Sequence, residues 1–330
     1  MIITRTPVRI SLLGGGTDYP DHFRQHGGQT LGVAIDKFSV ITVNRLASLF
    51  DYSIRVSYSR TELARSLEDI QHPAVRECLR FMGIDGGIEI HYMGDLPART
   101  GLGSSSSFTV ALLHALHALK GDLVSQETLA LEAVHVEHAL IRERVGVQDQ
   151  YTCAHGGLLH LRFGRDGQVA VARVPLGRER LEELRSHLML MYSGIQRHAH
   201  EVIEDQIART RQGLLAADLG RLADLVGEGL EALTGNGPIA RLGALLHAAW
   251  GIKRGLSSRI SSALIDAYYE RALRAGAMGG KLLGAGSGGF MLLFAPPERQ
   301  EAVAAALPEL RRVPFDFDHA GSSLVFYQPQ

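Results

Sequence analysis

The chain of 330 residues is 45% hydrophobic, which is enough apolar sequence to build the core of one large domain or two ordinary ones. Its net charge of −1 and pI near 7 do not suit a protein that binds nucleic acid or a membrane surface. The two cysteines provide no disulfide framework, the N-terminal segment lacks the layout of a signal peptide, and no uncharged apolar run approaches the ~18 residues that span a bilayer. We therefore expect a cytoplasmic protein with neither nucleic-acid nor membrane partners.

The first predicted element is a β-strand over residues 2–13, which ends at three consecutive glycines, Gly14 to Gly16. Arg9 lies inside this apolar strand, where an unpaired guanidinium would be very unfavourable, so it requires an anionic partner. That partner is either a carboxylate in the interior or a bound phosphate. Asp18 follows the glycines and either caps the turn or accepts hydrogen bonds from ligand hydroxyls.

A loop rich in glycine and serine follows strands predicted at 30–35, 39–44, 54–58 and 87–92 and a helix predicted over 62–82. The loop, residues 94–107, reads GDLPARTGLGSSSS and precedes a helix at 108–119 that has almost no polar face. This pattern predicts a buried helix whose first turn opens onto a ligand. The free N–H groups and the positive end of the helix dipole would favour a phosphate there. The alternative is a serine-capped helix after an ordinary turn.

Glu137 lies on the apolar stripe of a second predicted helix, which runs from residue 125 to about residue 144. A carboxylate that faces inward requires a cation, which is either an arginine or Mg²⁺ beside the phosphates. Glu143, which also has apolar neighbours, is the competing candidate for this role. Asp149 stands just beyond the helix, where it either caps the helix end or orients an attacking hydroxyl.

We place a domain boundary between residues 175 and 176, within a charged, turn-rich region. The two expected domains are residues 1–175, with the phosphate loop and catalytic residues, and residues 176–330. In the second domain the sequence predicts a strand at 188–192, mainly helices up to about residue 275, a helix at 298–307 and a strand at 323–327.

A third glycine-rich stretch, residues 279–294, contains the spacing G-x-G-x-x-G. Dinucleotide-binding sites require a helix after these glycines, and a nucleophile elbow with Ser287 would require one too, but the sequence that follows predicts a strand. The loop at 94–107 is not a P-loop either, because no Gly-Lys-Ser/Thr follows its glycines. We therefore interpret the third stretch as a loop whose backbone lies against a ligand.

Three of these stretches, in this order, resemble the three motifs of the GHMP kinase family, named for galactokinase, homoserine kinase, mevalonate kinase and phosphomevalonate kinase. They read TPVRISLLGGGTDY at 6–19, PARTGLGSSSS at 97–107 and KLLGAGSGGF at 281–290. The resemblance implies an α+β fold of two domains, with an N-terminal domain like domain 2 of ribosomal protein S5 and a ferredoxin-like C-terminal domain. It places the active site between them and implies ATP and Mg²⁺ as cofactors.

The resemblance also implies roles for individual residues. Asp149 would abstract or orient the proton of the acceptor hydroxyl, with Arg9 beside it, and Ser105 and Glu137 would bind Mg²⁺. The residues expected to contact ATP are Pro97, Thr100, Gly101, Leu102, Gly103, Ser104, Ser105 and Ser106. Those expected to contact the acceptor are Gly15, Gly16, Thr17, Asp18, Tyr19, Gly284, Gly286, Ser287 and Gly288.

One departure from the galactokinase pattern bears on the acceptor. Galactokinases have a Glu-His pair before Thr-Asp, whereas Gly15 and Gly16 occupy those positions here. The chain is more similar to the heptose 7-phosphate kinases of the family, which phosphorylate the anomeric C1 hydroxyl of D-glycero-D-manno-heptose 7-phosphate on the way to nucleotide-activated heptose for surface polysaccharide. For the phosphate of such an acceptor the candidates are Arg197, Lys253, Arg254 and Lys281, chosen for their position near the expected site loops.

Three alternatives remain. The chain could be another sugar 1-kinase of the fucose or galactose type, or a non-catalytic regulator that binds a sugar or nucleotide on the same fold. A serine hydrolase is the most distant. The resemblance is compatible with a homodimer but does not determine the oligomeric state.

Overall fold

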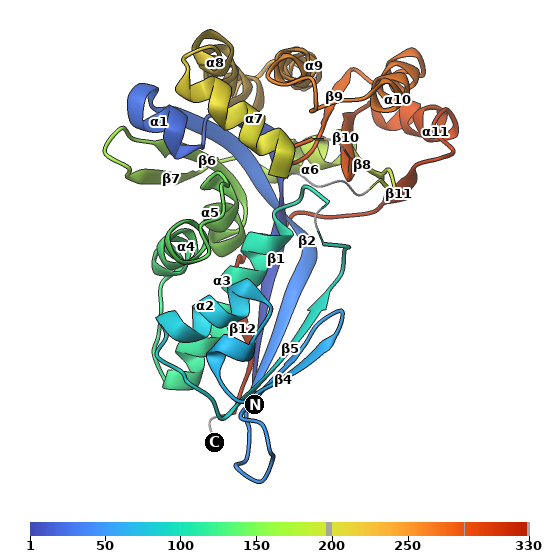
Figure 1. The fold of residues 1–330 in the computed structure, drawn as a ribbon. Coiled ribbons are helices and arrows are strands. Elements are labelled where there is room, and N and C mark those ends of the chain that lie inside the picture. The colour runs from blue at the N-terminus through green and yellow to red at the C-terminus, as the bar shows by residue number, and fades with distance from the viewer. Residues whose placement is uncertain (99, 196–199, 287, 329–330) are drawn as a thin grey trace.

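Two β-sheets of unequal size organise the chain (Figure 1). The computed structural model describes residues 1–98, 100–195, 200–286 and 288–328, with the backbone only at residues 200 and 201. The larger sheet has the strand order β12-β1-β2-β5-β3-β4, and β6 and β7 extend it from β2. Its strands are β1 (Ile2–Leu13), β2 (Gly28–Arg45), β3 (Ile54–Ser57), β4 (Thr61–Ala64), β5 (Ile88–Gly94), β6 (Leu158–Phe163), β7 (Val169–Arg173) and β12 (Ser323–Tyr327).

The smaller sheet has the order β11-β8-β10-β9 and lies beyond one end of the long strands β1 and β2 (Figure 1). Its strands are β8 (Leu188–Tyr192), β9 (Gly279–Leu282), β10 (Phe290–Phe294) and β11 (Arg311–Val313). The helices of the chain are α1 (Pro20–His26), α2 (Pro73–Phe81), α3 (Ser104–Lys120), α4 (Gln126–His135), α5 (Gln148–His155), α6 (Arg178–His187), α7 (His200–Arg211), α8 (Ala216–Thr234), α9 (Ala240–Gly255), α10 (Ala263–Arg274) and α11 (Gln300–Ala305).

Helices α2 to α5 lie on one side of the larger sheet (Figure 1). In β3 and in the second half of β2, buried and partly exposed residues alternate, which is the pattern of a sheet covered on one face. The second half of β1 is different, because it is buried at every position from Thr6 to Leu13. Helix α8 contacts β1 and β2 there, so this part of the sheet is covered on both faces and joins the two halves of the molecule.

Most of the predicted strands are confirmed, but several helices are not as expected. The helix predicted over 62–82 is wrong for its first half, because residues 61–64 pair with β3 and Pro73 begins the helix α2. The helix predicted to reach residue 144 ends its regular part at His135 and continues as a π-helical turn, Val136–Leu140. A short helix that was not predicted, α5, then begins at Gln148.

The last strand departs from the expected domain division. β12 pairs with β1, so a segment assigned to the second domain completes the first sheet, and both chain ends lie at the same end of the molecule (Figure 1). The boundary between residues 175 and 176 falls between β7 and α6 and stays a prediction.

Candidate active site

The loop before α3 presents the start of a buried helix to a cavity. Gly101 and Gly103 have φ angles of 86° and 73°, in the left-handed region that favours glycine. A side-chain carbon on Gly101 would lie 2.5 Å from the carbonyl oxygen of Leu283, so the glycine also permits close packing against the third glycine-rich loop. The first N–H groups of α3 have no acceptor within the helix, and Ser104 and Ser105 line the cavity. This end of the helix is suited to bind phosphate.

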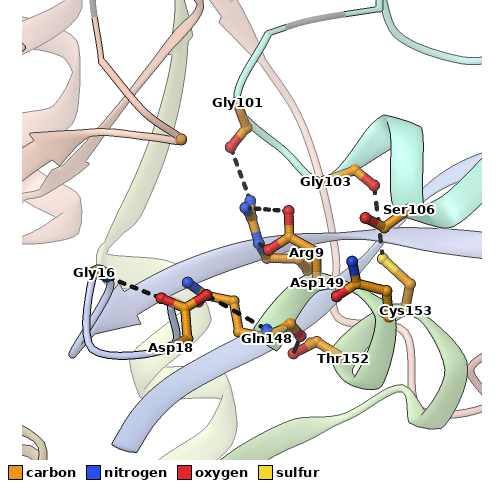
Figure 2. Close-up of polar contacts among 12 residues, drawn as sticks. Arg9, Gly16, Asp18, Gly101, Gly103, Ser106, Gln148, Asp149, Thr152 and Cys153 are labelled. Atoms are coloured by element: carbon orange, nitrogen blue, oxygen red, sulfur yellow. Dashed lines mark hydrogen bonds and ion pairs between the residues drawn. The ribbon is translucent and has the colours of Figure 1, made fainter. Parts of the chain in front are cut away.

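Arg9 connects this loop to Asp149 (Figure 2). Its Nε and Nη2 donate hydrogen bonds to the two carboxylate oxygens of Asp149, at 2.7 and 2.8 Å, and its Nη1 donates to the carbonyl oxygen of Gly101 at 2.8 Å. Burial would lower the pKa of Arg9, but the charge and hydrogen bonds of Asp149 outweigh burial and raise it. The guanidinium is therefore charged and fully oriented. The sequence left open a carboxylate or a phosphate as its partner, and the carboxylate is present.

Asp149 lies beyond the preceding helix, as expected, and belongs to the first turn of the short helix α5. The positive end of the α5 dipole favours a carboxylate at this position. A side-chain carbon on Gly103 would lie 3.2 Å from Asp149 Oδ2, so the carboxylate sits directly against the start of α3. The side chain of Asp149 is 24% exposed and that of Arg9 only 5%, so the carboxylate is the more accessible member of a pair in which both residues line the cavity.

Asp18 joins the first glycine loop to the start of α5 (Figure 2). Its Oδ1 accepts a hydrogen bond from the Gly16 N–H at 2.9 Å, and its Oδ2 accepts one from the Gln148 N–H at 3.4 Å. A side-chain carbon on Gly146 would lie only 1.8 Å from Asp18 Oδ2, so glycine is required beside it. Burial, reinforced by the charge of Asp149, raises the pKa of Asp18 above its ordinary value.

Thr17 does not line the cavity, and its predicted contact with the acceptor stays a prediction. Its hydroxyl is buried, donates to the carbonyl oxygens of Gly14 and Gln29, and accepts from the Gln29 N–H. Thr17 therefore fixes the shape of the glycine loop, whereas Gly15, Gly16, Asp18 and Tyr19 line the cavity.

Glu137 lies in the π-helical turn after α4, and its carboxyl group is buried. Its Oε2 accepts hydrogen bonds from Ser106 Oγ, at 3.0 Å, and from Gln150 Nε2, whereas Oε1 has no partner in the part of the chain that the structure describes. Burial raises the pKa of Glu137 to about 8. The unsatisfied oxygen fits a divalent cation, which would compensate for burial of the carboxylate. Ser106 rather than Ser105 makes the contact with Glu137, and Ser105 faces the cavity.

A cavity of about 840 Å³ is lined by residues of the glycine loops together with Arg9, Asp18 and Asp149, whereas Glu137 is buried and does not line it. Of the loop residues expected to contact ATP, Gly101, Gly103, Ser104 and Ser105 line it. The other described members are placed differently, because Thr100, Leu102 and Ser106 are buried and the Pro97 carbonyl accepts a hydrogen bond from the Thr100 hydroxyl. They shape the loop rather than face the cavity.

Two buried lysines from the other half of the chain also line the cavity. Lys253 of α9 donates to the carbonyl oxygens of Leu282 and Gly284, and Lys281 of β9 donates to that of Leu12. In the described residues, neither ammonium group forms an ion pair with a carboxylate. Burial, with repulsion from Arg9, lowers the pKa of Lys253 to about 8, and burial with repulsion from Lys253 lowers that of Lys281 well below its ordinary value.

We expect Lys253→Met to stabilise the free protein in a pH-dependent way. The pKa of Lys253 is about 8 when folded, against an ordinary value of ~10.4, so the unfolded chain binds more protons between these values and wild-type stability rises with pH across that window. Because methionine removes this effect, the stability advantage of the variant should be greatest below pH 8, at roughly 3 kcal/mol or less, and disappear above pH ~10.4. Urea unfolding of both proteins at several pH values measures the difference, and a difference independent of pH would contradict the prediction.

The third glycine loop is only partly as expected. Gly284 lines the cavity, but side-chain carbons on Gly286 and Gly288 would meet the carbonyl oxygens of Ile260 and Ile195, at 2.6 and 2.5 Å. These two glycines therefore permit packing within the protein, and their predicted contact with the acceptor stays a prediction. Ser287 and Arg197 lie outside the described residues. Arg254, another phosphate candidate, is paired with Asp266 at 3.0 Å.

Comparisons with known proteins identify the family. Residues 42–157 match the GHMP kinases N terminal domain and residues 228–311 match GHMP kinases C terminal, and together these matches span more than half of the chain. The chain belongs to the GHMP kinase family.

Relatives of this GHMP kinase include sugar kinases. It is 23% identical to the D-glycero-alpha-D-manno-heptose 7-phosphate kinase of Campylobacter jejuni over 93% of each chain, and 23% identical to the galactokinase of Pyrococcus furiosus over 93% of this chain and 92% of that one. The crystal structure of a D-glycero-D-manno-heptose 1-phosphate kinase from Bacteriodes thetaiotaomicron has a TM-score of 0.74 at 22% identity and covers 99% of this chain and 100% of that one. The predicted GHMP kinase fold and the prediction of an ATP-dependent sugar kinase are both confirmed.

An aromatic wall of this kinase was not predicted from the sequence. Tyr58, His72, Tyr92 and Phe108 line the cavity on the side of the α3 start. The rings of His72 and Phe108 stack with centroids 4.8 Å apart, and Tyr92 meets Phe108 edge-on at 5.1 Å. Tyr92 and Phe108 stand at the two ends of the glycine- and serine-rich loop in the sequence, and this was the signal available for finding them.

Among the described residues of the kinase, every helix is too short or too polar to cross a membrane.

Proposed function

We propose that this kinase transfers the γ-phosphoryl group of ATP to the anomeric C1 hydroxyl of D-glycero-D-manno-heptose 7-phosphate, forming the 1,7-bisphosphate. The observation that carries the reaction type is the bidentate Arg9–Asp149 pair, which stands between the start of α3 and the first glycine loop. Phosphoryl transfer requires mainly positioning and charge stabilisation, and this pair provides both next to a phosphate-binding helix end. The similarity to the Campylobacter enzyme supports the choice of acceptor.

In this proposal each part of the cavity has one task. The start of α3 holds the phosphates of ATP, and the aromatic wall of Tyr58, His72, Tyr92 and Phe108 provides ring faces for the adenine. Asp149 accepts the proton of the acceptor hydroxyl, or orients it, while Arg9 fixes the carboxylate and adds positive charge near the transferring group. Asp18 lies at the acceptor side. The product would serve nucleotide-heptose synthesis for surface polysaccharide in the cytoplasm.

We assign Mg²⁺ to Glu137 together with the hydroxyl of Ser105. The ion would neutralise charge on the ATP phosphates, and the unpartnered Oε1 of Glu137 is the group that would receive it. The chain's own contribution is to hold this carboxylate in place through Ser106 and Gln150.

We expect Glu137→Gln to raise the Mg²⁺ concentration needed for half-maximal activity by at least about tenfold, because an amide is a much weaker ligand than a carboxylate. ADP release measured over a range of Mg²⁺ at fixed ATP gives this value. Glu143→Gln is the matched control, since Glu143 lines the cavity and was the competing candidate for the ion. If Glu143→Gln rather than Glu137→Gln raises the Mg²⁺ concentration needed for half-maximal activity, the ion is assigned to Glu143.

The acceptor is tested by ADP release from ATP with a panel of sugars. We expect turnover with D-glycero-D-manno-heptose 7-phosphate and little or none with galactose or fucose. Turnover with galactose or fucose alone would overturn the acceptor and support another sugar 1-kinase. Binding of ATP and sugars without any turnover would support a regulator, although the intact Arg9–Asp149 pair argues against one.

A further inference from the structure

Several buried polar groups that line the cavity have no part in the proposed reaction, and three of them carry this inference. Lys281, Ser11 and Lys253 are 4%, 5% and 9% exposed, and all three line the cavity. The hydroxyl oxygen of Ser11 has no hydrogen-bond partner in the described part of the chain. Buried polar groups are normally satisfied, so an unpartnered hydroxyl beside two ammonium groups indicates a missing ligand.

These groups converge where Gly15 has no side chain. A side-chain carbon on Gly15 would lie 3.2 Å from Ser11 Oγ and 3.8 Å from Lys281 Nζ. Lys253 joins the group from α9, and its charge repels that of Lys281. The two lysines hydrogen-bond only to main-chain carbonyl oxygens in the described residues, and the charge of Asp18 offsets the effect of burial on their pKa values only in part. An anion bound beside Gly15 would neutralise them and would complete the hydrogen bonding of Ser11.

We infer that Lys253, Lys281 and Ser11 form a site for a phosphate group that the acceptor itself carries, so the acceptor class is a sugar phosphate rather than a free sugar. The inference rests on the proposed function for the position of the acceptor. Ser11 is two residues beyond Arg9 along β1, a rise of ~6.6 Å, and Gly15 belongs to the same loop as Asp18. In the proposed function the phosphates of ATP occupy a separate place, at the start of α3.

Lys281→Met tests this with matched acceptors, heptose 7-phosphate and the same heptose without its phosphate. We expect kcat/KM for the phosphorylated acceptor to fall by about 10- to 100-fold, the range for losing a hydrogen bond to a charged group, and kcat/KM for the free heptose to change little. Lys120→Met is the control, because Lys120 also donates to a carbonyl oxygen, that of Met82 at 3.3 Å, but lies at the far end of α3.

Thermal unfolding of the same variants separates a functional from a structural role. Removing a buried, unneutralised charge should leave the Tm of Lys281→Met equal to or above that of wild type. A lower Tm with unchanged preference for the phosphorylated acceptor would overturn the inference and make the lysine structural. An equal fall in kcat/KM for both acceptors, together with a higher KM for ATP, would also overturn the inference. It would mean that the lysines contact the transferring phosphoryl group.

The test of the phosphate site can be separated from the test of the proposed heptose acceptor. If wild type does not use heptose 7-phosphate, the same comparison is made with mannose 6-phosphate and mannose. A Lys281-dependent preference for mannose 6-phosphate would support the phosphate site while the proposed heptose acceptor fails. Turnover of free sugars only would overturn the phosphate site and leave the chain a sugar kinase.

Discussion

Asp149→Asn is expected to lower kcat by about 10²–10⁴-fold, the range for loss of a positioned general base, and to leave ATP affinity unchanged. Asparagine keeps the shape of the side chain but cannot take a proton. Its amide nitrogen would also face a donor of Arg9, because both carboxylate oxygens of Asp149 accept hydrogen bonds from that guanidinium. The start of α3 does not depend on this charge, so the nucleotide should still bind.

The measurement is a rapid-quench single turnover, because slow product release could hide a change in the chemical step during steady-state assays. Asp166→Asn is the control, since Asp166 lies in the β6–β7 turn, where it accepts a hydrogen bond from the Gln168 N–H. Full activity in Asp149→Asn would remove Asp149 from the mechanism and leave positioning by α3 and Arg9 as the source of catalysis.

The pairing of Arg9 with Asp149 shows which part of this site could be predicted from the sequence and which part could not. An arginine within a strand that is otherwise apolar must find an anion, and this follows from the cost of burying an unpaired charge. The sequence alone could not choose the partner, because Asp149 is distant along the chain and α5, which positions it, was not predicted. Three motifs in family order gave the fold and the enzyme class, and the comparisons confirm both.

Other details of the fold and the site could not be predicted from the sequence, because tertiary contacts determine them. Residues 61–64 are a strand only because they pair with β3. Ser105 and Ser106 are equivalent in the sequence, yet the turn of α3 directs Ser106 inward to Glu137 and Ser105 outward to the cavity. Gly286 and Gly288 have the composition of a ligand loop, but their close approaches are to Ile260 and Ile195.

We expect Arg9→Lys to reduce kcat by about 10²-fold or more, because the variant no longer holds the carboxylate of Asp149 in its orientation. The guanidinium contacts both oxygens of Asp149 and the Gly101 carbonyl at the same time, and a lysine ammonium has no planar fork that could reach all three. We also expect the free energy of unfolding to fall by about 1–3 kcal/mol, as for a lost hydrogen bond to a charged group. Urea unfolding measures this, with Arg5→Lys as the control because Arg5 is exposed on the same strand and stacks on Phe38.

A double-mutant cycle then shows whether the pair acts as one unit. If Arg9 works by fixing the Asp149 carboxylate, Arg9→Lys should cost little further activity once Asp149→Asn is present, because there is no longer a base to orient. If the double variant instead shows the product of the two single-variant losses in activity, the prediction is contradicted. That result would mean that Arg9 acts separately, through its hydrogen bond to the Gly101 carbonyl and the phosphate loop behind it.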